Sequence, residues 1–152
     1  MERQVETLLK GRQFKQLLGA CIDSLKKEYG LRSVEIEALY YLSCCGENNA
    51  AKDIAASLCI NKGHLSAAME SLCRRGYVSA EKDTADYRLV RYRITDAAQQ
   101  VTSEINTAVG RLYSALFAGI TSEDQETLRR VAAQMTENIG RLLQQKTNKG
   151  DD

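Results

Sequence analysis

Two helical segments in the middle of this 152-residue chain are joined by a link of two residues, Cys59 and Ile60. The first segment, AAKDIAASLC (50–59), has apolar residues at helical spacing, and its last residue, Cys59, is also the first residue of the link. The second, NKGHLSAAMESLCRRG (61–76), begins with Asn61, which is suited to cap a helix. The second segment is also the longer and the more basic of the two. A pair of helices joined so tightly predicts a helix-turn-helix.

The rest of the sequence predicts a mainly helical fold. Apolar residues recur at helical spacing from about Val5 to Tyr29, and the chain contains no Pro that would break a helix. Three further helices are expected to follow caps at Ser33, Thr95 and Thr121. Three glycines are expected to end helices: Gly30, Gly46 and Gly119.

After Gly76 the apolar residues follow the period of a strand instead. The segments YVSAEK (77–82) and RLVRYRI (88–94) alternate, and the turn-forming stretch DTADY lies between them, so a β-hairpin is expected. One face of the second strand is expected to point outward: Leu89, Arg91 and Arg93. The other face is expected to meet the core: Val90, Tyr92 and Ile94.

The distribution of charge favours a nucleic-acid partner for the middle of the chain. Residues 52–93 carry eight Lys or Arg and five Asp or Glu, whereas the remainder carries 13 basic and 15 acidic residues. A chance excess of surface charge explains the same numbers equally well. No apolar run approaches the roughly 20 residues that span a bilayer, and the N-terminal residues lack the pattern of a signal peptide, so a cytoplasmic location without membrane contact is expected.

The sequence predicts neither a cofactor nor a metal site. The five cysteines form no C-x-x-C pair, and His64 is the only histidine, so no familiar metal cluster is present. With no Gly-rich phosphate loop and no recognisable pair of carboxylates, the sequence does not predict an enzyme. Packing in the core is the role expected for all five thiols: Cys21, Cys44, Cys45, Cys59 and Cys73.

The helix expected after Asn61 carries unusually small residues on its outward side. Its inward stripe is ordinary: Leu65, Met69 and Leu72, flanked by Ala68 and Cys73. The opposite side and its margins are short or polar: Gly63, Ser66, Ala67, Glu70, Ser71 and Arg74. A slim helix can enter a DNA major groove about 12 Å wide, and Lys62 adds a positive charge near its N-terminus. Close packing against another helix is the alternative explanation for the small residues.

The hairpin carries basic side chains next to this helix. Turn residues place Arg88 just beyond the tip, and Asp86 is close enough to orient its guanidinium group. A narrow minor groove attracts an inserted arginine. An isolated charged hairpin is usually a solvated turn, but its position directly after this helix favours contact with the same duplex.

The stretch from Leu31 to Thr95 resembles the MarR-type (multiple antibiotic resistance regulator) winged helix-turn-helix proteins. The family's opening L-T-x-x-Q-x-x-v-L-x-x-L is similar to LRSVEIEALYYL (31–42). Its D-K-s-t-v-t followed by L-x-x-x-G-x-V is similar to NKGHLS and LCRRGYV. Its wing D-x-x-D-x-R, followed by L-T, is matched at five positions: Asp83, Asp86, Arg88, Ile94 and Thr95.

The resemblance implies a transcription factor, usually a repressor, that reads a palindromic operator as a homodimer and responds to a small-molecule effector. It implies one domain over residues 1–146, with a winged helix-turn-helix at 31–95 and dimerisation helices at 1–29 and 96–146. The polar tail at 147–152 is expected to be disordered. The residues expected to contact DNA, or to position such a contact, are Lys62, Gly63, His64, Ser66, Ala67, Arg74, Asp86 and Arg88. Gly63 and His64 depart from the small hydroxyl residues common in the family, and Tyr87 replaces a frequent basic residue.

Two other functions are compatible with the sequence. A winged helix can serve as a protein-interaction adaptor that does not read DNA. A regulator can also sense oxidants through a thiol, and Cys21, Cys44 or Cys45 would then carry the sensing step, although no electropositive setting is evident around Cys44 and Cys45.

Overall fold

The structure is a computed structural model that describes residues 11–147. The chain divides into two compact units, Met1–Leu112 and Tyr113–Asp152. The predicted start of the first helix near Val5 lies outside the described residues. The predicted disordered tail also lies outside them, except for Thr147, which ends the last helix.

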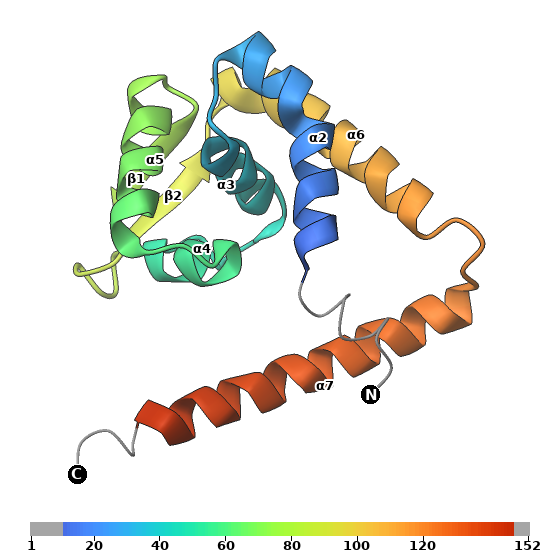
Figure 1. The fold of residues 1–152 in the computed structure, drawn as a ribbon. Coiled ribbons are helices and arrows are strands. Elements are labelled where there is room, and N and C mark those ends of the chain that lie inside the picture. Colours follow the sequence, from blue (N-terminus) through green and yellow to red (C-terminus); the bar gives the residue numbers. More distant parts are fainter. Residues whose placement is uncertain (1–10, 148–152) are drawn as a thin grey trace. The chain divides into compact units, whose positions relative to one another are not determined.

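The fold is mainly helical with one two-stranded hairpin, as the sequence predicted (Figure 1). The described elements, in chain order, are α2 (Arg12–Tyr29), α3 (Ser33–Cys44), α4 (Ala51–Leu58), α5 (Lys62–Arg74), β1 (Val78–Lys82), β2 (Val90–Ile94), the 3-10 turn η1 (Asp96–Ala98), α6 (Gln99–Leu116) and α7 (Ser122–Thr147). The predicted helix-turn-helix is thus formed by α4 and α5.

One hydrophobic core holds α2 to α6 of the first unit together. The expected inward stripe of α5 is confirmed, because Leu65, Met69 and Leu72 are at most 2% exposed. Their neighbours in this core come from every other helix of the unit: Ile22, Ile36, Leu39, Ile54, Val101 and Ile105. Each such side chain contributes about 1.5–3 kcal/mol when it is fully buried. This burial determines which side of α5 faces away from the core.

Local signals fix the two ends of α5. The Asn61 side chain accepts a hydrogen bond from the His64 backbone N–H at 2.9 Å, as expected for a cap. After the helix, Gly76 adopts a left-handed conformation (φ +73°), which is far less strained for glycine than for other residues. The chain can therefore reverse directly from α5 into β1.

A buried carboxylate positions α3 against α5. Ser33 was expected to cap α3, but it is the first helical residue, and the preceding Arg32 is the cap residue. The Glu35 side chain reaches back to accept from the Arg32 backbone N–H at 2.6 Å, as the third helical residue does in a capping box. Burial opposes the charge of Glu35, but hydrogen bonds from Arg32 and Ser71 hold its pKa below the usual value. Ser71, expected at the margin of the outward face, is accordingly half-buried.

The hairpin is antiparallel and is attached to the loop before α4. Its register pairs Val78 with Ile94 and Lys82 with Val90. Ala50 forms an isolated bridge with Arg91 of β2, and the Tyr92 backbone N–H donates to Asn49 O at 3.0 Å. These contacts tie β2 to the segment before α4.

The last helix, α7, begins as the sequence predicted. Thr121 accepts from the Asp124 backbone N–H at 3.1 Å, and Gly119 precedes it in a left-handed conformation. Several large apolar side chains of α7 are 45–61% exposed: Leu128, Val131, Ile139, Leu142 and Leu143. No described helix is both long and apolar enough to cross a membrane.

Candidate nucleic-acid interface

The N-terminal half of α5 presents an exposed face of small and polar residues. The core holds Leu65, Ala68 and Met69, while the intervening positions point outward. Five of the residues predicted to contact DNA are exposed there: Lys62, Gly63, His64, Ser66 and Ala67. The side of α5 that was predicted to face DNA therefore lies on the surface of this unit.

Two features keep the first turn of α5 ordered and thin. The Asn61 side-chain nitrogen lies 3.3 Å from His64 Nδ1, while its oxygen caps the helix by accepting from the His64 backbone N–H, so Asn61 contacts both the ring and the backbone of His64. A Cβ atom added at Gly63 would meet nothing closer than Asn61 Oδ1 at 3.5 Å, which is ordinary contact. Packing within the described chain therefore does not require glycine at this position.

The two arginines at the C-terminal end of α5, Arg74 and Arg75, make different contacts. Arg74 is exposed, and its guanidinium lies 3.9 Å from the carboxylate of Glu70 one turn earlier, as opposite charges at i and i+4 of a helix can. The Arg75 guanidinium, in contrast, donates to Tyr29 O at 2.9 Å and Gly30 O at 2.6 Å. Those carbonyls end α2 and lack helical partners, so Arg75 satisfies them and joins α5 to α2.

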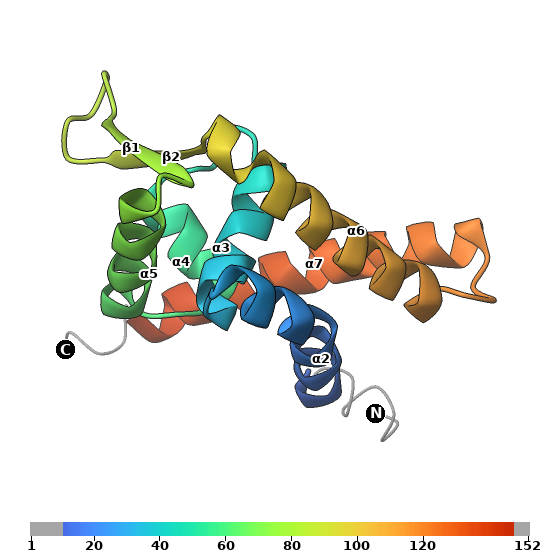
Figure 2. The same cartoon turned by 90° about the horizontal axis from the view of Figure 1, so that it is seen from above.

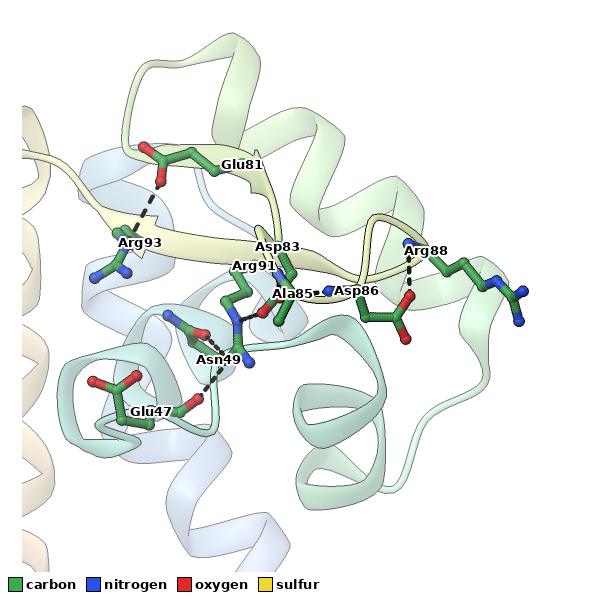
Figure 3. A network of polar contacts seen from close by, with 9 residues as sticks. All are labelled: Glu47, Asn49, Glu81, Asp83, Ala85, Asp86, Arg88, Arg91 and Arg93. Atoms are coloured by element: carbon green, nitrogen blue, oxygen red, sulfur yellow. Dashed lines mark hydrogen bonds and ion pairs between the residues drawn. The ribbon is translucent and has the colours of Figure 1, made fainter.

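The wing is braced by an ion pair at its base (Figure 3). Asp83 accepts from the Ala85 and Asp86 backbone N–H groups at 2.8 and 2.9 Å, and its other carboxylate oxygen pairs with Arg91. The Arg91 guanidinium also donates to Glu47 O at 2.8 Å and to Asn49 Oδ1 at 3.0 Å. These contacts link the wing loop to the loop before α4.

The prediction that Arg91 points outward into solvent is wrong. Its side chain is 29% exposed, because acceptors on the α3–α4 loop and Asp83 surround the guanidinium. Arg93 on the same strand is exposed and lies 3.8 Å from Glu81, as an outward position requires. The alternation of the strand correctly predicted that Arg93 is exposed. It could not predict that the α3–α4 loop covers Arg91, the other arginine on the same face.

The wing tip is a tight turn. The Leu89 backbone N–H donates to Asp86 O at 2.9 Å, so Tyr87 and Arg88 are the two central residues of a β-turn. Asp86 was expected to orient the Arg88 guanidinium, but its carboxylate accepts from the Arg88 backbone N–H at 3.0 Å instead. Figure 3 shows the guanidinium pointing away from the loop. Asp86 therefore shapes the turn, and the Arg88 side chain is exposed to solvent.

The exposed face of α5 and the projecting wing belong to the same unit (Figures 1 and 2). In Figure 2 the wing loop extends beyond helices α3, α4 and α5. Lys62 and Arg88 therefore lie on two neighbouring structural features that the core and the Asp83–Arg91 brace join. The arrangement can present one helix and one ribbon to a single extended partner.

A cavity of about 850 Å³ lies elsewhere in this unit. Its apolar lining includes Phe14, Leu18, Ile22, Ile36, Leu58 and Ile105. Charged and thiol groups also line it: Lys15, Glu37, Cys44, Cys45 and Cys59. Burial raises the pKa of Glu37, although nearby Lys15 opposes that effect. The cavity combines an apolar wall with a few polar groups, as small-molecule sites do.

The cysteines do not all pack in the core. Cys44 and Cys59 are exposed, so the expected packing role is wrong for them. Cys59 is the C-cap of α4 and adopts a left-handed conformation (φ 52°), so the helix ends here and the chain continues into the link to α5. Cys73 is half-buried, and burial raises its thiol pKa. Burial and the neighbouring Cys44 raise the pKa of Cys45, which disfavours a reactive thiolate there.

Comparison with known proteins finds a matching domain model and several similar solved structures. Residues 31–98 match the model of a winged helix DNA-binding domain. A transcriptional regulator of the MarR family from Silicibacter pomeroyi has a similar structure, with a TM-score of 0.74 and 22% identity over 86% of this chain and 87% of that chain. The chain has the MarR-type winged helix fold.

Two further structures share the MarR-type fold. A MarR protein from Peptoclostridium difficile DA00132 has a TM-score of 0.69 and 20% identity, covering 88% of this chain and 86% of that chain. A MarR transcriptional regulator from Methanosarcina mazei Go1 has the same score and identity, covering 90% and 99%. The coverage includes the helices on both sides of the winged helix lobe, so the fold implied by the sequence resemblance is confirmed for most of the chain.

The Asp83 brace predicts how stability depends on pH. Hydrogen bonds from Asp86 and Ala85 and the pairing with Arg91 lower the pKa of Asp83 from 3.8 to about 2. A carboxyl group with a lowered pKa stabilises the folded state above its unfolded pKa and loses that contribution as the pH falls through its folded pKa. The unfolding free energy of the wild type should therefore decrease, relative to that of Asp83→Asn, between about pH 4 and pH 2.

Urea denaturation of both proteins across this pH range measures the difference. Carboxyl-detected NMR gives the Asp83 titration directly. A midpoint near 3.8 together with parallel stability profiles would contradict the brace.

Proposed function

We propose that this protein is a sequence-specific DNA-binding transcriptional regulator. The observation that carries the proposal is the pairing of a slim, exposed α5 face with an arginine at the tip of a braced wing. The major groove is about 12 Å wide and admits one helix, while a narrow minor groove attracts an arginine. Membership of the winged helix class and the likeness to MarR-type regulators support the same conclusion.

The predicted contacts divide into three groups. Gly63, His64, Ser66 and Ala67 would lie at base edges in the major groove, where the thin face lets the backbone approach. Lys62 and Arg74 would contact phosphates at the two ends of α5. Arg88 would enter the minor groove on a turn that Asp86 shapes.

Removing either outer cation should weaken DNA binding. Lys62→Ala and Arg88→Ala should each lower affinity and reduce the slope of log K against log salt by about 1, because each loses one charge near the DNA. The probe is a fluorescein-labelled 30-bp duplex that the wild type has selected from a random-sequence library, and anisotropy is recorded over a salt series. Arg12→Ala, at the first residue of α2 and outside the predicted DNA-contacting set, is the matched control and should bind as the wild type does.

An interaction adaptor that ignores DNA would behave differently. It would select no duplex, and Lys62→Ala and Arg88→Ala would leave the capture of its protein partner unchanged. Failure of the wild type to bind any duplex with salt dependence would contradict the regulator and favour the adaptor.

We infer that the regulator acts as a homodimer on a palindromic operator. The apolar side chains of α7 support this, because large exposed apolar patches mark interaction surfaces. A twofold assembly would present two copies of α5, and such symmetry matches a palindrome. Repression follows when the bound dimer blocks access to the promoter.

Charge placed on the α7 patch should disrupt the dimer. Ile139→Glu should convert a species of about twice 16.9 kDa into a monomer, because the carboxylate would be buried without a partner. Size-exclusion chromatography with light scattering measures the mass. Gln144→Glu, an exposed position on the same helix, adds the same charge and should leave the dimer intact; a monomeric wild type would contradict the inference.

The cavity of the first unit is our candidate for an effector site. Gly19 on α2 lines it, and a Cβ atom added there would enter open space. Gly19→Leu should therefore fill part of the cavity without a clash and retain the fold.

A thermal-shift screen tests this assignment with a library of small aromatic compounds. Compounds that raise the melting temperature of the wild type should lose that effect on Gly19→Leu, and they should weaken operator binding by the wild type. Equal shifts for both proteins would place the ligands elsewhere.

A further inference from the structure

The tyrosine at the wing tip has no structural task that explains its position. Tyr87 is 75% exposed, the largest exposed fraction among the large hydrophobic side chains of the described residues. No hydrogen bond or ring contact holds its side chain within the described part of the chain. By contrast, the hydroxyl of Tyr41 donates to Asn48 O at 2.8 Å. An aromatic ring exposed on a projecting loop is accessible to a partner outside the chain, and tyrosine offers such a partner both an apolar face and a polar tip.

The backbone beneath Tyr87 is held in place. Tyr87 and Arg88 are the central residues of the turn closed by Leu89 N–H and Asp86 O. Asp86 also accepts from Arg88 N–H, and the Asp83 N–H donates to Leu89 O at 3.0 Å. Because Asp83 is anchored through Arg91, the tip is a preorganised platform for two neighbouring side chains. A tyrosine on such a platform loses little entropy on binding, since it has only two side-chain torsions.

We propose that Tyr87 is a second DNA contact of the wing, beside Arg88. Its ring would pack against a deoxyribose at the edge of the minor groove, and its hydroxyl would donate to an adjacent phosphate oxygen. This rests on the proposed function, and it adds a contact that the charge pattern alone does not predict.

The chemistry of the side chain favours this partner. Tyrosine combines an apolar body with a polar tip, and the groove edge offers an apolar sugar next to an anionic acceptor. Arg88 occupies the next position of the same turn, so a groove that receives its guanidinium brings backbone atoms close to Tyr87. Because the phenol is neutral, Tyr87 would add affinity without displacing a counterion.

Salt dependence separates this contact from that of Arg88. Tyr87→Ala should weaken binding of the selected 30-bp duplex by about 5- to 20-fold, as expected for a lost ring contact and a lost hydrogen bond, with an unchanged salt slope. Tyr87→Phe keeps the ring and should lose about 2- to 5-fold through the missing hydroxyl. Arg88→Ala should instead reduce the slope by about 1. Thr84→Ala, on the same loop, is the control and should bind as the wild type does.

A fluorescent variant tests the contact without removing it. The chain contains no tryptophan, so Tyr87→Trp places the only indole at the wing tip. Addition of the duplex should quench or shift its emission and protect it from acrylamide, whereas Thr84→Trp should respond less.

Two results would overturn the proposal if Lys62→Ala and Arg88→Ala still weaken binding. One is that Tyr87→Ala binds the duplex with wild-type affinity. The other is that acrylamide quenches Tyr87→Trp equally with and without bound DNA. Loss of DNA binding by the wild type itself would instead refute the proposed function.

Discussion

The Asp83–Arg91 ion pair is the interaction on which the arrangement of the surface depends. Asp83 organises the wing loop through two backbone N–H groups, and Arg91 carries that order to the carbonyl of Glu47 and the side chain of Asn49. A two-stranded hairpin alone is marginally stable in water, so its position relative to α5 would otherwise vary. With the brace in place, the tip and the helix keep one spacing, which a partner with two fixed grooves requires.

A small number of contacts likewise fixes the position of α5 in the unit. Its buried stripe fixes its rotation, Asn61 fixes its start, and Arg75 ties its end to the carbonyls of Tyr29 and Gly30. Glu35 joins α3 to the middle of α5 through Ser71. Most of these polar contacts use groups that lie off the slim face. Within the face, the Ala67 carbonyl accepts from the Arg32 guanidinium at 3.2 Å, and His64 contacts Asn61.

Periodicity and local signals were enough to predict the order of helices and strands, the inward stripe of α5 and the caps at Asn61 and Thr121. They failed where tertiary contacts decide. Arg91 and Arg75 look like free surface cations in the sequence, yet carbonyl groups distant in sequence bind both of them. Asp86 was correctly placed at the turn, but only the geometry shows that it accepts from backbone rather than from the Arg88 guanidinium. Cys59 was misplaced because a left-handed residue breaks the helical pattern.

Hydrogen–deuterium exchange of the full chain, with and without the selected duplex, tests the central claim most directly. Binding through one helix and one braced ribbon predicts slower exchange in two separate segments, around 62–67 and 83–89. The surface of α7 should then show no protection beyond that of the protein alone. Protection confined to α7, or exchange unchanged in both segments while the duplex is bound, would contradict the claim.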